Sequence, residues 1–295
     1  MRRQFATLDV FTDRSFAGNP LAVVLDGEGL ETATMQVIAR EFSHPETVFM
    51  LPAREPSHRA RLRIFTPARE LPFAGHPTVG TAVLTALRDG ATPGHEFVLE
   101  EGIGPVRCKI EARSVAHGSA RFLVPQLPAE AGPMPNDATV AAALGISASD
   151  IGFAAFRPAR WSAGVAITFV PIGRLQAIAA CQPDPSKLTA IGDDPVYLFC
   201  GETVDAGHGF HARMFAPALG VREDPATGAA AAAFAGLLAA HGGLADGEHA
   251  IAIEQGYEMR RPSLIRLVAT LADGKLVAAS IGGDAVMVTE GSIEA

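Results

Sequence analysis

The sequence predicts an α+β protein made of two related domains, each with mostly antiparallel strands around one central helix. Three observations support this prediction. A chain of 295 residues is long enough for two full-sized cores. It contains an internal repeat whose copies are separated by about half the chain, which is typical of two homologous domains. Each copy includes an apolar helical segment, and short alternating segments typical of strands surround both copies.

The two copies of the repeat extend from Phe65 to Gly90 and from Phe215 to Gly243. Each contains Phe-x-Pro-Ala, a short polar loop, His or Asp followed by Pro-x-x-Gly-x-Ala, and an apolar segment that ends at glycine. The first prolines of the copies are 150 positions apart and the second prolines 148, so the second loop is shorter. His76 and Asp224 therefore occupy equivalent positions, each directly before a proline.

The position before each of these second prolines predicts a helix start. Proline is favoured in the first turn of a helix, so we expect His76 and Asp224 at the N-caps. Exposed N–H groups and the helix dipole make such a start a binding site for anions. The helices behind them are apolar on nearly every side, which indicates that both are buried. If the two starts share a cleft, they form one site between the domains.

The first domain is predicted to extend over residues 1–126. Its strands are expected where apolar and polar residues alternate between turn signals. A short amphipathic helix is expected at 34–42, because its apolar residues follow helical spacing. Four prolines between Pro125 and Pro135 indicate the linker. The expected strands are 5–10, 21–25, 46–51, 59–65, 97–99, 106–110 and 120–124.

The second domain is predicted to extend over residues 127–295, with a final strand that can cross back to the first domain. A short helix is expected at 138–144, and the central apolar helix at 229–240. The expected strands are 163–171, 196–200, 210–215, 251–255, 263–271, 276–281 and 285–288.

Composition argues against several classes of protein. The net charge of −8 argues against a nucleic-acid partner, which requires a basic surface. No apolar run reaches the ~18 residues of a membrane helix, and the N-terminus has no apolar signal-peptide core. Cys108, Cys181 and Cys200 are too far apart in sequence for a disulfide framework or a zinc pattern. We therefore expect a protein of the reducing cytoplasm, without nucleic-acid or membrane partners.

Common catalytic motifs are missing from the sequence. It contains no P-loop, no dinucleotide-binding fingerprint and no G-x-S-x-G nucleophile turn. His208 and His211 are the nearest approach to a metal pair, but no third ligand is close in sequence. We interpret them as structural polar residues, and we expect no metal site.

Single polar residues leave two interpretations open. Asp224 alone is a plain N-cap, whereas imidazole is not a favoured capping group, so His76 is equally well explained as a ligand-binding residue. Placed at matched helix starts, the two could hold the polar groups of one small molecule. Glu46 begins a strand and is a solvated carboxylate unless the fold buries it, in which case it suits a general base. Asn19 is most simply a turn residue.

Five segments together resemble the PhzF family, which is named after the isomerase of phenazine biosynthesis. They are DVFTDRSFAGNPLAVV, REFSHPETVFM, FTPARELPFAGHPTVGTA, EDPATGAAAAAF and QGYEMRRPS, in this order over nearly the whole chain. The resemblance implies the diaminopimelate epimerase-like fold: two pseudo-symmetric domains, each a mostly antiparallel β-barrel around a central helix. It also implies a homodimer and a site in the cleft between the domains.

The phenazine isomerase of this family uses a glutamate to move a proton between ring carbons of dihydro-hydroxyanthranilate, without a cofactor. By matched motif, the resemblance implies that Glu46 is this acid and base. The same matching implies that His76 and Asp224 are catalytic residues that orient the substrate.

Backbone amides at Gly75, Gly228 and Ala229 are then expected to bind the carboxylate of a small substrate. Pro45 departs from the serine that often precedes the family's glutamate, which removes a hydroxyl and an N–H beside the base. This departure leaves a ligand- or partner-binding protein without catalysis as the alternative. A third interpretation, an amino-acid epimerase or racemase, lacks the cysteine pair that such relatives carry at the two helix starts.

Overall fold

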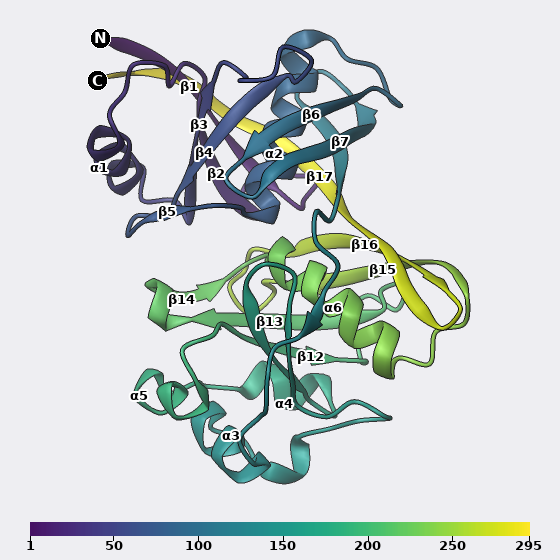
Figure 1. Ribbon diagram of the computed structural model, residues 1–295. Helices are drawn as coiled ribbons and strands as arrows, with labels where there is room; N and C mark the ends of the chain where they lie inside the picture. The colour runs from purple at the N-terminus through teal and green to yellow at the C-terminus, as the bar shows by residue number, and fades with distance from the viewer. The chain divides into compact units, whose positions relative to one another are not determined.

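Segments with alternating apolar side chains form strands, and the two long apolar segments form buried helices, in the computed structural model of the chain (Figure 1). The structure describes the backbone of all 295 residues and every side chain except that of Arg113. The chain divides into two compact units. Unit 1 contains Met1–Pro125 and Ile281–Ala295, and unit 2 contains Gln126–Ser280.

Unit 1 is a closed barrel of strands with one helix inside it. In ring order the strands are β1 (Arg2–Val10), β2 (Asn19–Val24), β3 (Glu46–Leu51), β4 (Ala60–Phe65), β6 (Glu96–Glu101), β7 (Gly104–Arg113), β8 (His117–Leu123) and β17 (Lys275–Glu294). The ring is closed because β17 pairs with both β8 and β1. The β2–β3 and β4–β6 pairs are parallel, whereas β1–β2, β3–β4 and β6–β7 are antiparallel.

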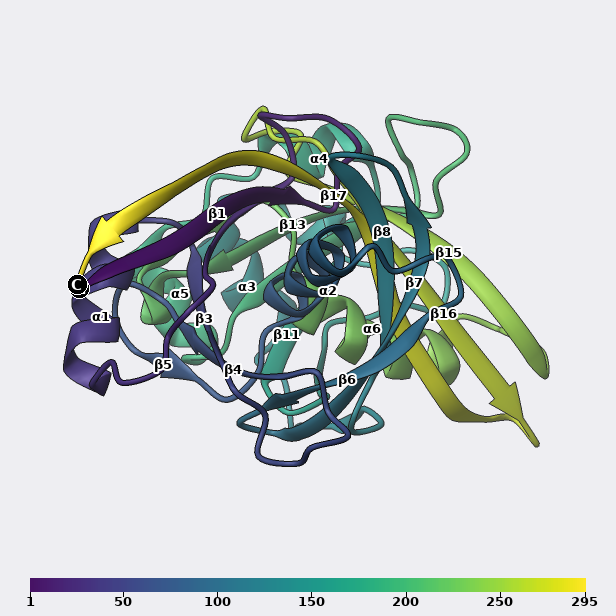
Figure 2. The same cartoon turned by 90° about the horizontal axis from the view of Figure 1, so that it is seen from above.

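The helix inside this barrel is α2 (Gly75–Asp89), which Figure 2 shows almost end-on. Its residues from Gly75 to Ala86 are all buried, and it contacts β1, β2, β3, β7 and β8. Because strands surround the helix, it has no solvent-exposed face along this stretch, and its polar residues, such as His76 and Thr78, are buried with the rest. It ends at Gly90, whose φ of 68° suits glycine. Outside the barrel, β5 (Glu70–Leu71) pairs with β4, and α1 (Thr32–Phe42) packs on β3 and β4.

Unit 2 repeats this strand pattern around α6 (Gly228–His241). Its sheet contains β9 (Ala129–Glu130), β10 (Ala159–Ser162), β11 (Ala166–Pro171), β12 (Val196–Cys200), β13 (Phe210–Ala216), β15 (Gly247–Gln255) and β16 (Ser263–Ala272), with β14 (Val221–Asp224) beside β13. The β11–β12 and β13–β15 pairs are parallel, whereas β10–β11, β12–β13 and β15–β16 are antiparallel. This order of parallel and antiparallel pairs is the same as that from β1 to β7.

Short helices cover one side of the sheet of unit 2. They pack on β11, β12 and β13 through one cluster of buried apolar residues that includes Val140, Ile178 and Leu198. The helices are α3 (Asp137–Leu144), α4 (Leu175–Ala180) and α5 (Pro185–Leu188), with 3-10 turns at Ala148–Asp150, Thr189–Ile191 and Pro217–Leu219.

Helix α6 is buried among aromatic rings. The ring of Phe234 lies 4.8 to 6.2 Å, between centroids, from those of Phe169, Tyr197, Phe199 and Phe210. These four rings come from β11, β12 and β13. Because most other residues of α6 are alanine, the helix leaves space for large side chains from the strands, and the interior is filled.

The two units also share a side-chain arrangement on β4 and β13. The residues are Arg63, Glu70 and Phe65 in unit 1 and Arg213, Glu223 and Phe215 in unit 2. In each unit the guanidinium binds the carboxylate through two contacts of 2.6 to 3.1 Å. It also lies 5.1 or 4.9 Å above the phenylalanine ring. The repeat in the sequence therefore extends to individual side-chain contacts.

This architecture confirms the predicted fold class, α+β with the diaminopimelate epimerase-like topology. One element prediction was wrong: the strands expected at 276–281 and 285–288 are a single strand, β17. Gly282 lies within β17 where it passes β8, and a Cβ there would be 2.7 Å from the Cβ of Arg121. The glycine therefore marks a close approach of two backbones and not a break in the strand.

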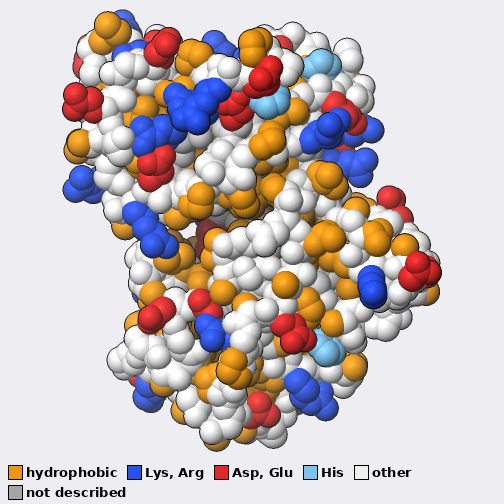
Figure 3. Space-filling view, viewed as in Figure 1, with side chains coloured by type: hydrophobic (Ala, Val, Ile, Leu, Met, Phe, Trp, Pro, Cys, Tyr) orange, Lys and Arg blue, Asp and Glu red, His pale blue; other side chains and the backbone are white. Residues whose placement is uncertain are grey.

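Acidic and basic side chains are interspersed on the face of unit 1 that Figure 3 shows. Some of them form exposed ion pairs, such as Arg59 with Asp89 at 2.6 Å. In the part of the chain that the structure describes, no helix has the length and the apolar composition to cross a membrane.

Candidate active site

Glu46 and His76 lie side by side in unit 1. Glu46 is the first residue of β3, where its backbone pairs with Leu21 of the parallel strand β2. His76 is the second residue of α2. Its Nε2 lies 3.3 Å from Glu46 Oε2, and the two side chains are 4% and 16% exposed. The structure therefore brings together two of the three residues that the sequence predicts to be catalytic.

The imidazole of His76 is neutral at physiological pH. Burial lowers the pKa of His76 to about 3, because an imidazolium in this place loses its hydration. A hydrogen bond from the ring to the Pro20 carbonyl oxygen acts in the opposite direction, and the nearby His44 lowers the pKa further. The effect of burial on the pKa is larger than that of the Pro20 hydrogen bond, so His76 carries no charge.

The contact with Pro20 also fixes which nitrogen of His76 carries the proton. A carbonyl oxygen only accepts hydrogen bonds, so the nitrogen that faces it is the N–H of the ring. Nε2 faces Glu46 and makes no hydrogen bond of good geometry with the described residues. The donor is therefore Nδ1, and Nε2 keeps its lone pair.

A bare Nε2 opposite a carboxyl group has a chemical consequence. When Glu46 is protonated, its O–H can donate to Nε2, and the 3.3 Å contact is attractive. When Glu46 is ionised, two lone pairs face each other, and the contact is unfavourable. The contact between the two side chains therefore differs between the two protonation states of Glu46.

Asp224 lies in unit 2, at the end of β14, and is 9% exposed. Its Oδ2 accepts a hydrogen bond of 2.5 Å from the Thr227 hydroxyl. Its backbone oxygen accepts one of 2.7 Å from Nε2 of Gln255. Gln255 Oε1 in turn accepts from the Thr227 amide at 3.2 Å. These contacts fix both the backbone and the side chain of Asp224.

The expectation that His76 and Asp224 are N-caps was wrong. The N-cap of α2 is Ala74, so His76 lies inside the first turn. The N-cap of α6 is Thr227, so Asp224 precedes the helix. Proline is tolerated at any position of the first turn, where its missing N–H would have no partner in the helix. A proline therefore locates a helix start only to within a turn.

The three predicted substrate-binding residues lie at helix starts, where N–H groups have no partner within the helix. Gly75 is the first residue of α2, and Gly228 and Ala229 are the first two residues of α6. Gly75 belongs to unit 1 and the other two to unit 2. Their role in binding a substrate stays a prediction.

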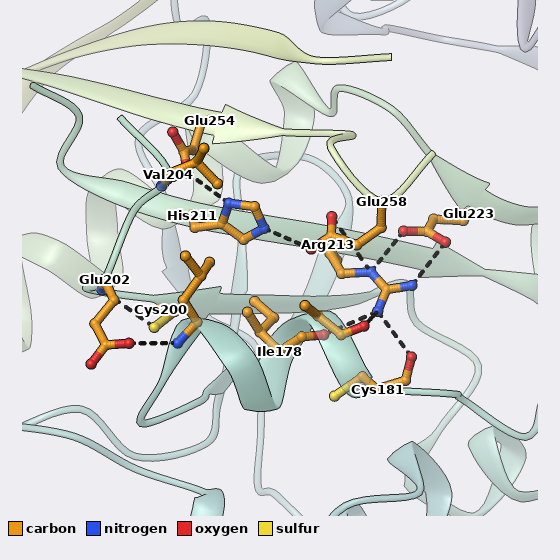
Figure 4. Close-up of polar contacts among 12 residues, drawn as sticks. Ile178, Cys181, Cys200, Glu202, Val204, His211, Arg213, Glu223, Glu254 and Glu258 are labelled. Carbon is orange, nitrogen blue, oxygen red and sulfur yellow. Dashed lines mark hydrogen bonds and ion pairs between the residues drawn. The ribbon is translucent and has the colours of Figure 1, made fainter. Parts of the chain in front are cut away.

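His208 and His211 contact one carboxylate, that of Glu254 (Figure 4 shows His211 between Glu254 and Glu258). Each donates from Nδ1 at 2.7 Å. Nε2 of His211 binds Glu258 at 2.9 Å. Among the described residues, no group of three or more His, Cys, Asp or Glu is placed to hold a metal ion. The two histidines hold loops together, as polar residues of the fold.

The charge on His211 follows from its two partners. Burial opposes the imidazolium, but the hydrogen bonds and charges of Glu258 and Glu254 outweigh it and raise the pKa of His211. Burial likewise opposes ionisation of both glutamates, but their hydrogen bonds lower their pKa values. The resulting ion pairs anchor the turn after β15, which contains most of the motif QGYEMRRPS.

The chain has the diaminopimelate epimerase-like fold, and its named relatives are isomerases. The family model of phenazine biosynthesis-like proteins, PhzC-PhzF, matches residues 8–291 of this chain. The chain belongs to this family.

Similar proteins agree with this assignment. An uncharacterized isomerase of Mesorhizobium japonicum is 46% identical over 299 residues, which cover 99% of this chain and 98% of the relative. The trans-2,3-dihydro-3-hydroxyanthranilate isomerase of Pseudomonas chlororaphis is 35% identical over 291 residues, 98% of each chain. Among solved structures, a PhzF-family phenazine biosynthesis protein of Bacillus anthracis has a TM-score of 0.88 at 26% identity over 100% of both chains.

Three residues that position the candidate site were not predicted from the sequence. Pro20 orients His76, while Thr227 and Gln255 orient Asp224. Thr227 and Gln255 lie inside the motifs DPATG and QGYEMRRPS, so their motifs were noted but their roles were not. Pro20 acts through a backbone carbonyl, which every residue has, and no sequence signal distinguishes it.

Proposed function

We propose that the protein is a cofactor-independent isomerase that moves a proton on a small carboxylate substrate, with Glu46 as acid and base. The observation that supports this most strongly is the 3.3 Å contact between Glu46 and the neutral His76. The relative from Pseudomonas chlororaphis is named for an isomerisation of trans-2,3-dihydro-3-hydroxyanthranilate. We propose a substrate of that class, a ring with a carboxylate and an amino group.

In the proposed reaction, the carboxylate of Glu46 removes a proton from one carbon of the substrate. The electron pair of the broken C–H bond moves into the conjugated ring, and Glu46 then delivers a proton to a second carbon, where a new C–H bond forms. Because the Glu46 side chain is 16% exposed, its carboxyl proton can exchange with solvent before this delivery. Atoms and electrons balance within the substrate, so the step needs no oxidant or reductant. One carboxylate serves both carbons, which therefore lie on the same face of the ring.

His76 contributes by binding one protonation state of Glu46 better than the other. Midway through the reaction Glu46 holds the substrate's proton, and its O–H can donate to Nε2 of His76. Before and after, the carboxylate cannot donate to Nε2. A hydrogen bond that forms only while Glu46 holds the proton lowers the activation barrier of the isomerisation. A hydrogen bond that is equally strong at every stage does not. Asp224 and the amides at the two helix starts are proposed to hold the polar groups of the substrate.

The experiment that tests this proposal is deuterium uptake. Trans-2,3-dihydro-3-hydroxyanthranilate is incubated with the protein in heavy water, and the mass of the product is measured. We expect isomerisation with deuterium at the new C–H position for the native protein, and a rate reduced at least ~10³-fold for Glu46→Gln. Glu41→Gln, an exposed change on α1, is the control and keeps the native rate. Equal uptake by the native protein and Glu46→Gln would contradict the role of Glu46.

Two other functions have less support. A thiol-based epimerase needs reactive cysteines at the helix starts, but Cys108, Cys181 and Cys200 lie in or beside strands and the short helix α4. All three are buried, and burial raises the pKa of each thiol. A binding protein without catalysis predicts that the substrate binds and no deuterium enters the product, so the same experiment distinguishes it.

A further inference from the structure

A buried carboxyl group near His76 has no role in the reaction proposed above. Glu101 is the last residue of β6, is 8% exposed, and lies against the first turn of α2. Its Oε1 is 2.7 Å from the hydroxyl oxygen of Thr78. Its Oε2 has no hydrogen-bond partner among the described residues, and these residues provide no ion pair for Glu101. A buried carboxylate in such a place is costly unless it is protonated.

The geometry around Thr78 indicates where the proton lies. The Thr78 hydroxyl oxygen is 2.8 Å from the Ala74 carbonyl oxygen and 2.7 Å from Glu101 Oε1. A hydroxyl has one proton, and a carbonyl oxygen can only accept it. Both contacts are hydrogen bonds at the same time only if Thr78 donates to Ala74 and Glu101 donates to Thr78. The neutral carboxylic acid satisfies this requirement, and the carboxylate does not.

Unit 2 has a neutral side chain at the matching position. Gln255 is the last residue of β15, as Glu101 is the last residue of β6, and both strands have the same parallel and antiparallel neighbours. The amide of Gln255 binds Thr227, the N-cap of α6, through both its oxygen and its nitrogen. A protonated glutamate has the shape and the donor–acceptor pair of glutamine, and each of the two side chains contacts a threonine at the start of its helix.

We propose that Glu101, in its neutral form, is a positioning residue that holds the first turn of α2 through Thr78 and thereby sets the place of His76 against Glu46. Ala74 and Thr78 flank His76 within this turn, and the N-cap Ala74 has no capping side chain. When Glu101 loses its proton, the Thr78 hydroxyl must turn its only proton toward the carboxylate. Its 2.8 Å bond to the Ala74 carbonyl oxygen is then lost, and only the 3.2 Å bond from the Thr78 N–H to that oxygen remains. The turn that carries His76 then changes. This inference rests on the proposed function only for its effect on catalysis.

The surroundings of Glu101 favour the neutral form over a wide pH range. Burial raises the pKa of Glu101 to about 8, and a bond that Thr78 would donate to the ionised carboxylate acts in the opposite direction. On β7 the neighbouring titratable group is the buried thiol of Cys108. On the side of β4 a hollow of about 720 Å³ is lined by Glu101 and by charged groups that include His58, Arg61, Arg63, Glu70 and Glu100. We therefore expect Glu101 to ionise, and the first turn of α2 to rearrange, near pH 8.

The test compares native protein with Glu101→Gln, which keeps the neutral side chain at every pH. The first readout needs no substrate: the ring signals of His76 are followed by NMR from pH 6 to pH 10. We expect them to shift in the native protein as Glu101 ionises and to stay constant in Glu101→Gln. The second readout is the rate of deuterium uptake, which we expect to fall about tenfold per pH unit above the transition in the native protein only.

Thr78→Val provides a second variant in case Glu101→Gln unfolds. Valine removes the hydroxyl that bonds to Glu101 and keeps the volume of the threonine side chain. We expect the alkaline shift of the His76 signals to disappear in this variant too. An alkaline shift that is the same in the native protein and in either variant would overturn the inference. If the signals respond as expected but the native protein gives no deuterium uptake, the positioning role stands and the proposed function fails.

Discussion

Two histidines of this chain are nearly inaccessible to water yet have opposite charge states. His76 is 4% exposed and His211 is 1% exposed. His76 has a carbonyl oxygen as its hydrogen-bond acceptor, and burial keeps it neutral. His211 has a carboxylate on each ring nitrogen, and these keep it charged. The partners therefore determine whether a buried imidazole is neutral or charged.

Replacing His211 with glutamine should destabilise the fold. The change removes the imidazolium between the carboxylates of Glu254 and Glu258, which are 0% and 15% exposed, and leaves them only His208 at 2.7 Å and Arg213 at 3.9 Å. We expect the free energy of unfolding to fall by about 3–5 kcal/mol at pH 6. His95→Gln, at an exposed histidine, is the control and should change it by less than ~0.5 kcal/mol. Chemical denaturation of the three proteins measures both effects.

The effect of His211→Gln should depend on pH with a defined sign. The pKa of His211 is raised from 6.5, so its contribution is complete below that value and is lost as the pH rises through the raised pKa. The glutamates have pKa values lowered from 4.5, so their contribution is complete above 4.5 and is lost on acidification. The difference between native protein and variant should be largest from pH 4.5 to 6.5. A difference that grows above pH 8 would contradict the ion pairs.

At the scale of elements, α2 is positioned by the close packing of barrel strands against it. A Cβ at Gly80 would lie 2.6 Å from Leu21 Cδ2 and 2.7 Å from Val10 Cγ2. The glycine therefore lets the helix approach the strands that carry Pro20, the hydrogen-bond partner of His76.

Gly80→Ala should lower stability even though alanine favours helices. The gain in helix propensity is about 1 kcal/mol. Overpacking against two buried side chains costs about 1–3 kcal/mol, so we expect a net loss of about 1 kcal/mol. Gly173→Ala is the control, because its Cβ would meet only atoms at 3.5 Å or more. Thermal unfolding checks the prediction. A Gly80→Ala protein that is more stable than the control would show that Leu21 and Val10 move aside for the new Cβ, and would contradict the prediction.

Helix positions explain why the helix starts were only partly predictable. The repeat aligns His76 with Asp224, but one lies inside α2 and the other precedes α6. The turn before α6 is held by Gln255 through Thr227, whereas Thr78 and Glu101 hold the first turn of α2. Contacts between residues far apart in the chain determine where α2 and α6 begin. Local sequence signals do not reveal these contacts.

At the scale of the whole molecule, the duplication was the most informative feature of the sequence. It predicted two related units with one buried helix each, because apolar patterning and turn residues are local properties. The motifs then indicated, by resemblance to the family, that Glu46, His76 and Asp224 are candidate catalytic residues. The sequence did not predict the neutral state of His76 or the proton of Glu101. Both depend on burial and on partners from other strands, which only the folded chain brings together.

The proposed role of Glu46 depends on a neutral His76 whose Nε2 carries no proton and faces the carboxyl group. The most direct measurement is the ¹⁵N NMR spectrum of histidine-labelled protein, with His76 assigned among the nine histidines by its loss in His76→Gln. We expect a protonated Nδ1 and an unprotonated Nε2 from pH 5 to pH 8, because burial lowers the pKa of His76 to about 3. A doubly protonated ring at pH 6, or a proton on Nε2 of the neutral ring, would contradict it.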